Sequence, residues 1–328
     1  MKNLSRNMLL LLASIIVSFI LLEGLIRLLF PIYDPSGQIL YYRMDDGWCL
    51  GPKDVKLIHW TRTGDFKVPV TFNRYGLRDS KDFQNATEDD LFVVGDSFSF
   101  GWGVREEDRY SNVLESLLDV SVYNVSIPND LLGYENLLQY ALKNGADVRR
   151  VIVGVCMAND LKDYEADKPM YKINVNKLAN IKSFFERHSA AYIALATFLH
   201  HNQTLRKLAY RLGVLERTIV VSNTNIYSEK ALKSSVNKLK EMLLAFQSYI
   251  LIIPSQSLWA GNNKETESKV HERFVSLLRE VGLSVIDLRP IFEAGGDPLQ
   301  YHFKENPHWN EKGHALAARV IAAHIGRK

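Results

Sequence analysis

Strand-like and helix-like segments alternate along most of the chain, and this constrains the fold more than any other feature. The strand-like runs are rich in Val, Ile or Leu and short enough to be buried on both faces of a sheet: Leu91–Val94, Val120–Val125, Val148–Val155, Tyr249–Ile253 and Leu283–Asp287. Helical patterns with one apolar stripe lie between them, most clearly over Tyr110–Leu118, Leu131–Leu142 and Val270–Val281. The alternation predicts an α/β fold in which helices cover both faces of a mostly parallel sheet.

Two segments lie outside this alternation. Residues 31–87 are rich in Tyr, Gly, Pro, Asp and Arg, and we expect an N-terminal extension of loops and short strands, including a strand at Val68–Phe72. The second, about residues 161–221, is a helical insertion that is too long for an ordinary loop. Its composition favours a subdomain packed on the core. A lid, a substrate wall or a surface resting on the membrane are the alternatives, because aromatic and basic residues mix there.

The N-terminus carries an apolar run, Met8–Phe30, of 23 residues. As a helix it is about 34 Å long, which matches a hydrocarbon core of about 30 Å. Its two charges, Glu23 and Arg27, lie four residues apart and can pair on one helical face. A cleaved signal peptide is the alternative, but no small-x-small cleavage site follows the run. We therefore expect a retained transmembrane anchor over 8–30.

The flanking charges predict the orientation of this anchor. Lys2 and Arg6 precede it, so residues 1–7 should form a cytoplasmic tail and the rest of the chain should be extracytoplasmic, which means periplasmic in a Gram-negative cell. The chain has 40 basic and 37 acidic residues, a balance that argues against a nucleic-acid partner. Cys49 and Cys156 could form one disulfide or remain two thiols, since the sequence gives no distance between them.

The first strand-like run leads into the most informative stretch, LFVVGDSFSFGWGV, which covers Leu91–Val104. The run ends abruptly at Gly95-Asp96-Ser97, and glycine allows the sharp turn and close approach of backbone N–H groups that a ligand site needs. Ligands of parallel sheets bind beyond the carboxyl ends of the strands, where Ser97 would lie. Ser97 is therefore the candidate nucleophile.

Three further polar segments support this candidate. NVSIPND, ending at Asp130, follows the second predicted strand, and MAND, ending at Asp160, follows the third. Near the C-terminus, NPHWN precedes a predicted closing helix at Glu311–Ile325. A serine, amide donors and a histidine are thereby expected at one edge of the sheet.

In these four blocks, VVGDSFSFGWG, NVSIPND, MAND and HWNEKGH, the chain resembles the SGNH (GDSL-type) hydrolase superfamily. The resemblance is greatest to its membrane-anchored extracytoplasmic members related to the alginate O-acetylation proteins. It covers roughly Asp90–His324 and implies an SGNH hydrolase-like domain over 88–328, folded as a three-layer flavodoxin-like sandwich.

The resemblance also assigns roles to individual residues. It makes Ser97 the nucleophile and His308 the base that accepts its proton, as a serine hydroxyl requires. The backbone N–H groups of Ser97 and Asn129 and the side-chain amide of Asn159 would form the oxyanion hole. No cofactor or metal is implied, and His314, on the closing helix, is expected to pack rather than to bind a metal.

The sequence departs from the family pattern at two places. Asn129 stands where glycine is usual. The family also has an aspartate two or three positions before the histidine, where this chain has Asn306 and Glu305. Asn306 can fix the tautomer of His308 without supplying charge, whereas Glu305 supplies charge if its side chain reaches, and the expectation favours Glu305. Asp287 and Asp297 are weaker candidates, because aspartate is common before turns.

The resemblance implies a membrane-anchored serine esterase or O-acyltransferase that forms an acyl-serine intermediate. Its expected substrate is an extracytoplasmic ester, such as an O-acetyl group of a cell-surface polysaccharide, and envelope polysaccharide assembly proteins are expected partners. Two alternatives remain: a non-catalytic SGNH-fold binding or scaffold protein, suggested by the missing acid and by Asn129, and a lipase acting on membrane lipid.

Overall fold

A computed structural model describes residues 2–30, 33–35, 39, 41–43, 48–61, 64–165, 184–185, 188–201 and 228–326. The chain forms two compact units. One contains Met1–Gln38 and Tyr171–Ser222, and the other contains Ile39–Met170 and Asn223–Lys328. We refer to them as the anchor unit and the hydrolase unit.

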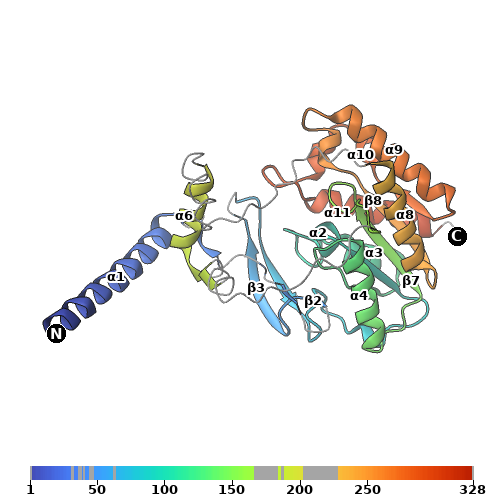
Figure 1. The fold of residues 1–328 in the computed structure, drawn as a ribbon. Coiled ribbons are helices and arrows are strands. Elements are labelled where there is room, and N and C mark those ends of the chain that lie inside the picture. Colours follow the sequence, from blue (N-terminus) through green and yellow to red (C-terminus); the bar gives the residue numbers. More distant parts are fainter. Residues whose placement is uncertain are drawn as a thin grey trace. The chain divides into compact units, whose positions relative to one another are not determined.

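The anchor unit is built on the N-terminal helix α1 (Lys2–Leu29) (Figure 1). Its stretch Arg6–Leu29 is long and apolar enough to cross a membrane, although a signal sequence would meet the same criterion. Arg27 Nε lies 2.7 Å from Glu23 Oε1, so the expected charge pair forms. A second helix, α6 (Ala190–His201), packs against α1. This helix comes from the predicted insertion, and the rest of the insertion lies mostly outside the described residues, so its packing on the core stays a prediction.

The hydrolase unit contains a five-stranded parallel sheet, as predicted. Its strands are β5 (Leu91–Gly95), β6 (Val122–Asn124), β7 (Arg150–Cys156), β8 (Gln247–Ile253) and β9 (Val285–Asp287). They lie in the order β6-β5-β7-β8-β9, and every pair is parallel. This is the flavodoxin-like order, with a switch point between β5 and its neighbours β6 and β7. The order places the ends of β5, β6 and β7 side by side.

Helices cover both faces of this sheet (Figure 1). One core cluster joins the sheet to α4 (Leu131–Lys143), α8 (Glu229–Leu243) and α9 (Lys264–Glu280). The other joins it to α3 (Tyr110–Leu118), α10 (Arg289–Ala294) and the closing helix α11 (Glu311–Ile325). Alternate residues of β5 enter the two clusters, Phe92 one and Val93 the other. The three-layer sandwich is therefore confirmed.

The segment before β5 forms two antiparallel pairs, β1 (Tyr42–Arg43) with β2 (Cys49–Leu50) and β3 (Val55–Trp60) with β4 (Lys67–Phe72). Three short 3₁₀ helices, η3 (Phe83–Asn85), η4 (Gln256–Leu258) and η5 (Pro298–Tyr301), lie in connections. Cys49 and Cys156, both among the described residues, are not joined by a disulfide.

Candidate active site

The nucleophile candidate lies at the carboxyl end of β5, where the chain turns into the short helix α2 (Ser97–Phe100). Asp96 caps this helix, because its side chain accepts the N–H of Phe98 at 2.9 Å. Gly95 is needed for the turn, since a Cβ there would lie 2.3 Å from Ser99 Oγ. Ser97 is therefore held at the first position of a capped helix, at the edge of the sheet.

His308 reaches this serine from the C-terminal part of the chain. Its Nε2 lies 2.7 Å from Ser97 Oγ, and its Nδ1 lies 2.6 Å from Asn306 Oδ1. An antiparallel bridge between His302 and Trp309 closes the loop that carries His308. The structure thus joins residues 211 positions apart into a hydrogen-bonded chain of serine, imidazole and amide.

The hydrogen bonds around Asn306 determine which ring nitrogen of His308 carries the proton. Asn306 Oδ1 also accepts the backbone N–H of His308 at 3.1 Å, which identifies that atom as the carbonyl oxygen of the amide. A carbonyl oxygen only accepts, so Nδ1 of His308 donates to it. The other nitrogen, Nε2, is then left as the acceptor for the Ser97 hydroxyl proton, which is the state that a general base requires.

Aromatic side chains enclose the imidazole. Trp102 stacks on the His308 ring at a centroid distance of 5.6 Å, and the Phe98 ring lies 5.0 Å away. Burial, with smaller effects from His59 and His302, lowers the pKa of His308 to about 4. His308 is therefore neutral and able to accept a proton throughout the physiological pH range.

Glu305 does not take the place expected for it. Its side chain is 58% exposed and lies 4.0 Å from Lys304 Nζ. Its backbone N–H points to the carboxylate of Asp65. In the described part of the chain, no hydrogen bond or ion pair joins Glu305 to His308, so the structure corrects the preference for Glu305 in favour of Asn306.

The other two carboxylates have structural partners elsewhere. Asp287 Oδ1 lies 2.9 Å from His271 Nε2, and Asp297 caps η5 through the N–H of Leu299. His314 is buried, and its Nδ1 accepts the N–H of Tyr110 at 3.3 Å. The expected packing role of His314 is therefore confirmed.

The expected oxyanion donors lie at the carboxyl ends of three adjacent strands. Ser97 follows β5, Asn129 lies between β6 and α4, and Asn159 follows β7. The Asn159 residue is exposed, and Asn129 is half-buried with its side chain against Gly133, where a Cβ would lie 2.0 Å from Asn129 Cγ. Asn129 has no positive φ, so its backbone does not need the glycine that is usual there. Their role as oxyanion donors remains a prediction.

A buried polar cluster supports the turn that carries Ser97. Asp160, directly after Asn159, accepts the Tyr134 hydroxyl at 2.9 Å and the Cys156 N–H at 2.7 Å. Burial raises the pKa of Asp96 to about 7 and the pKa of Asp160 well above its ordinary value, and their mutual repulsion adds to the shift of Asp160. The sequence pattern did not indicate this cluster, whose residues lie beneath the ends of β5 and β7.

Two buried arginines hold the glycine-rich loop after α2. Arg78 Nη1 donates to the carbonyl oxygens of Phe100 and Gly101, and its Nη2 donates to that of Val104 at 2.6 Å. Arg109 in turn donates to the carbonyl oxygen of Arg78. The sequence analysis missed both residues. This clamp fixes the segment that carries Trp102 against the His308 ring.

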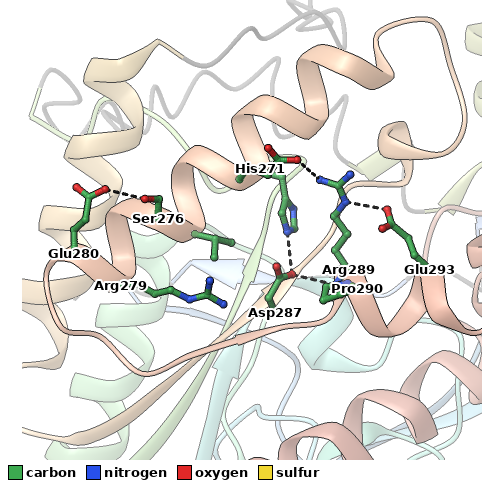
Figure 2. A pocket seen from close by; sticks show the side chains of 10 residues that line it. His271, Ser276, Arg279, Glu280, Asp287, Arg289, Pro290 and Glu293 are labelled. Carbon is green, nitrogen blue, oxygen red and sulfur yellow. Dashed lines mark hydrogen bonds and ion pairs between the residues drawn. The ribbon is translucent and has the colours of Figure 1, made fainter.

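A cavity of about 590 Å³ lies elsewhere in the hydrolase unit, between α9 and the residues that follow β9 (Figure 2). His271 pairs there with Asp287, and Arg289 pairs with Glu272 and Glu293. These opposite charges are already paired with one another. Its histidine bonds an aspartate and its serine bonds a glutamate, so the cavity has no counterpart of the hydrogen-bonded serine and histidine of the Ser97 site.

The strand order and the Ser97–His308 pair are typical of the SGNH hydrolase-like fold. More specifically, residues 241–328, which include Asn306 and His308 but not Ser97, match the family model described as "SGNH hydrolase-like domain, acetyltransferase AlgX". The match bears out the resemblance stated above over these residues, and the family that it describes is one of SGNH-type hydrolases and acetyltransferases.

Solved structures of the same fold are only distantly similar. One is a member of the lipolytic protein G-D-S-L family from Veillonella parvula, with 14% identity over 73% of this chain and 99% of that chain and a TM-score of 0.43. Another is a catalytic mutant of Axe2, an acetylxylan esterase from Geobacillus stearothermophilus, with 12% identity over 72% and 94% of the two chains and a TM-score of 0.41. None of the curated proteins compared with this sequence matches it significantly.

Proposed function

We propose that this protein is a membrane-anchored serine esterase or O-acyltransferase that acts on O-acetyl groups of an extracytoplasmic polysaccharide. The observation that carries the proposal is the hydrogen-bonded series from Ser97 Oγ through His308 to Asn306, with distances of 2.7 and 2.6 Å. It supplies a nucleophile, a neutral base and a group that fixes the base in the required tautomer.

In the proposed first step, Ser97 Oγ attacks the ester carbonyl carbon while His308 Nε2 takes the hydroxyl proton. The carbonyl oxygen becomes an oxyanion, which the N–H groups of Ser97 and Asn129 and the amide of Asn159 would stabilise. Collapse of this intermediate breaks the bond to the leaving alcohol, and His308 returns the proton to that oxygen. An acyl-Ser97 ester remains.

In the second step, water or a sugar hydroxyl gives its proton to His308 and attacks the acyl-Ser97 carbonyl carbon. The resulting intermediate breaks its bond to Ser97 Oγ, and His308 returns the proton to that oxygen, which regenerates the free serine. Water completes hydrolysis, whereas a sugar hydroxyl completes acetyl transfer. The substrate assignment rests on the family match, whose description names an acetyltransferase. The extracytoplasmic location rests on α1 and on the basic residues Lys2 and Arg6 that precede its apolar stretch.

The proposal is tested with purified full-length protein in detergent. A fluorophosphonate probe should label the wild type at Ser97 and should fail to label Ser97→Ala, with Ser99→Ala as the matched serine control. Turnover of p-nitrophenyl acetate should follow the same pattern. Adding candidate polysaccharides and analysing them for new acetyl esters then separates the two reactions, because only a transferase yields acetylated glycan.

The replacement of the acid by Asn306 specifically favours one rival, a non-catalytic scaffold with the same fold. A scaffold retains the Ser97–His308 contact but has no turnover. Wild-type protein that binds glycan while resisting both the probe and the ester would support this rival and contradict the proposal.

A further inference from the structure

The helix α6 has the composition of a membrane segment and not of a surface helix. The sequence Ala190–Leu199, AAYIALATFL, carries no charged residue and has no polar face. Leu195 and Phe198 are 57% and 59% exposed, as is Phe184 (59%) shortly before the helix. A helix that is apolar on all sides is buried in protein or in lipid, and in the described structure only one side of α6 is covered.

The covered side of α6 faces α1 at a defined level of the anchor. An apolar hollow of about 580 Å³ lies between the two helices and is open enough that the exposed Leu195 and Phe198 also line it. Its other lining residues include Phe19, Leu22 and Ile26 on α1 and Ala191 on α6. Phe19 precedes the end of α1 by ten residues, or about 15 Å at 1.5 Å per residue, which is half of a hydrocarbon core of about 30 Å. The helix α6 therefore contacts the C-terminal half of α1.

The start of α6 is satisfied without water. Glu23 of α1 accepts the N–H groups of Ala190 at 2.8 Å and Ala191 at 3.0 Å. The N–H of Tyr192 goes to Ser189 Oγ, that of Ser189 goes to the Phe185 carbonyl oxygen, and the Ser189 hydroxyl donates to Glu23. All four amides that a helix start normally leaves for solvent thus have acceptors. Hydrocarbon requires such complete pairing of backbone groups, whereas a helix in water does not.

The charge of Glu23 is balanced at the same place. Arg27 donates to Glu23 at 2.7 Å, to Asp34 at 2.9 Å and to the carbonyl oxygen of His188 at 2.7 Å. Ionisable residues within membrane segments pair with one another or with backbone groups. Here the pair also joins the two helices, so Glu23 and Arg27 connect the insertion to the anchor.

We infer that α6 is embedded in the outer leaflet of the bilayer beside α1, so that the insertion is a second membrane-contacting element. Lipid acyl chains cover the exposed face of α6, because this face continues the apolar surface of α1 at the same depth. The inference rests on the proposed membrane anchor and not on the proposed chemistry at Ser97.

Photocrosslinking tests this inference with the full-length chain. The protein is reconstituted into vesicles of phosphatidylethanolamine and phosphatidylglycerol that contain a phospholipid with a diazirine in its acyl chain, and crosslinked peptides are mapped by mass spectrometry. Crosslinks on Leu195 and Phe198 should match those on Leu21 of α1. They should exceed those on Leu244, an apolar side chain of the hydrolase unit that is 76% exposed, by at least about tenfold, because hydrocarbon excludes hydrated segments.

A pair of variants sharpens the result. Leu195→Asp should reduce crosslinking of α6 by more than about tenfold, since a carboxylate is strongly disfavoured in hydrocarbon, while Leu244→Asp should leave it unchanged. Crosslinks on α1 with none on α6 would overturn the inference and leave the anchor intact. A chain without crosslinks on either helix would overturn both the inference about α6 and the proposed membrane anchor. Fluorophosphonate labelling of Ser97 reports separately on the proposed chemistry.

Discussion

Asn306 stands where an acid would stabilise the protonated base, so restoring the acid should change both rate and pH dependence. A carboxylate at this position would lie about 4 Å from the centre of the His308 ring, where two unit charges interact by about 4 kcal/mol at an effective dielectric constant of 20. One pKa unit corresponds to about 1.36 kcal/mol, so this interaction would raise the pKa of His308 from about 4 to about 7. The same attraction acts on the imidazolium formed in the transition state.

Asn306→Asp should therefore raise kcat for p-nitrophenyl acetate at pH 8 by at least about tenfold, below the roughly 10⁴ that the converse change costs a serine protease. The half-burial of Asn306 limits the gain, because the new carboxylate keeps part of its hydration. The acid limb of the kcat/KM profile should move from about pH 4 to about pH 7.

The neighbouring change Glu305→Gln is the control and should alter neither quantity, because the Glu305 side chain faces solvent beside Lys304. The test is to measure kcat and kcat/KM between pH 3.5 and 9 for the wild type and both variants. The reasoning is refuted if Asn306→Asp leaves both the rate and the acid limb of the wild type in place, or if Glu305→Gln reproduces the loss expected for a triad acid.

Three further predictions follow from buried charges. Burial lowers the pKa values of His302 and His308 to about 4 and of His314 to about 3, so the unfolded chain binds more protons below pH 6.5, and the Tm should fall as the pH falls from 6.5 to 4. Asp96 has a raised pKa of about 7, so between about pH 4 and pH 7 it is protonated in the folded state and ionised in the unfolded chain, which lowers the stability of the wild type as the pH rises. Asp96→Asn, which can keep the helix cap, should therefore gain Tm relative to the wild type as the pH rises from 4 to 8. Arg78→Met leaves three carbonyl groups without their donor, so urea unfolding should show a loss of about 3 kcal/mol or more, and probe labelling of Ser97 should slow.

The sequence predicted the core of the hydrolase unit closely because its patterns are local. The runs at Leu91–Val94 and Tyr249–Ile253 lie within β5 and β8, and the helix predicted over Glu311–Ile325 has the bounds of α11. Buried parallel strands and amphipathic helices can be recognised from the pattern of a few consecutive residues. The partner of α6 could not be predicted in this way, since its contact with Glu23 joins positions 166 to 168 residues apart.

The choice between Glu305 and Asn306 shows where sequence reasoning about a site stops. Both residues could be placed near His308 by spacing, and charge favoured glutamate. The structure favours asparagine for a local reason: Asn306 Oδ1 accepts the N–H of His308, two residues on, which is a turn that asparagine forms and glutamate does not. That bond holds the amide oxygen in place for the ring nitrogen Nδ1. The side chain that orients His308 is therefore selected by the geometry of the turn first, and only then by its charge.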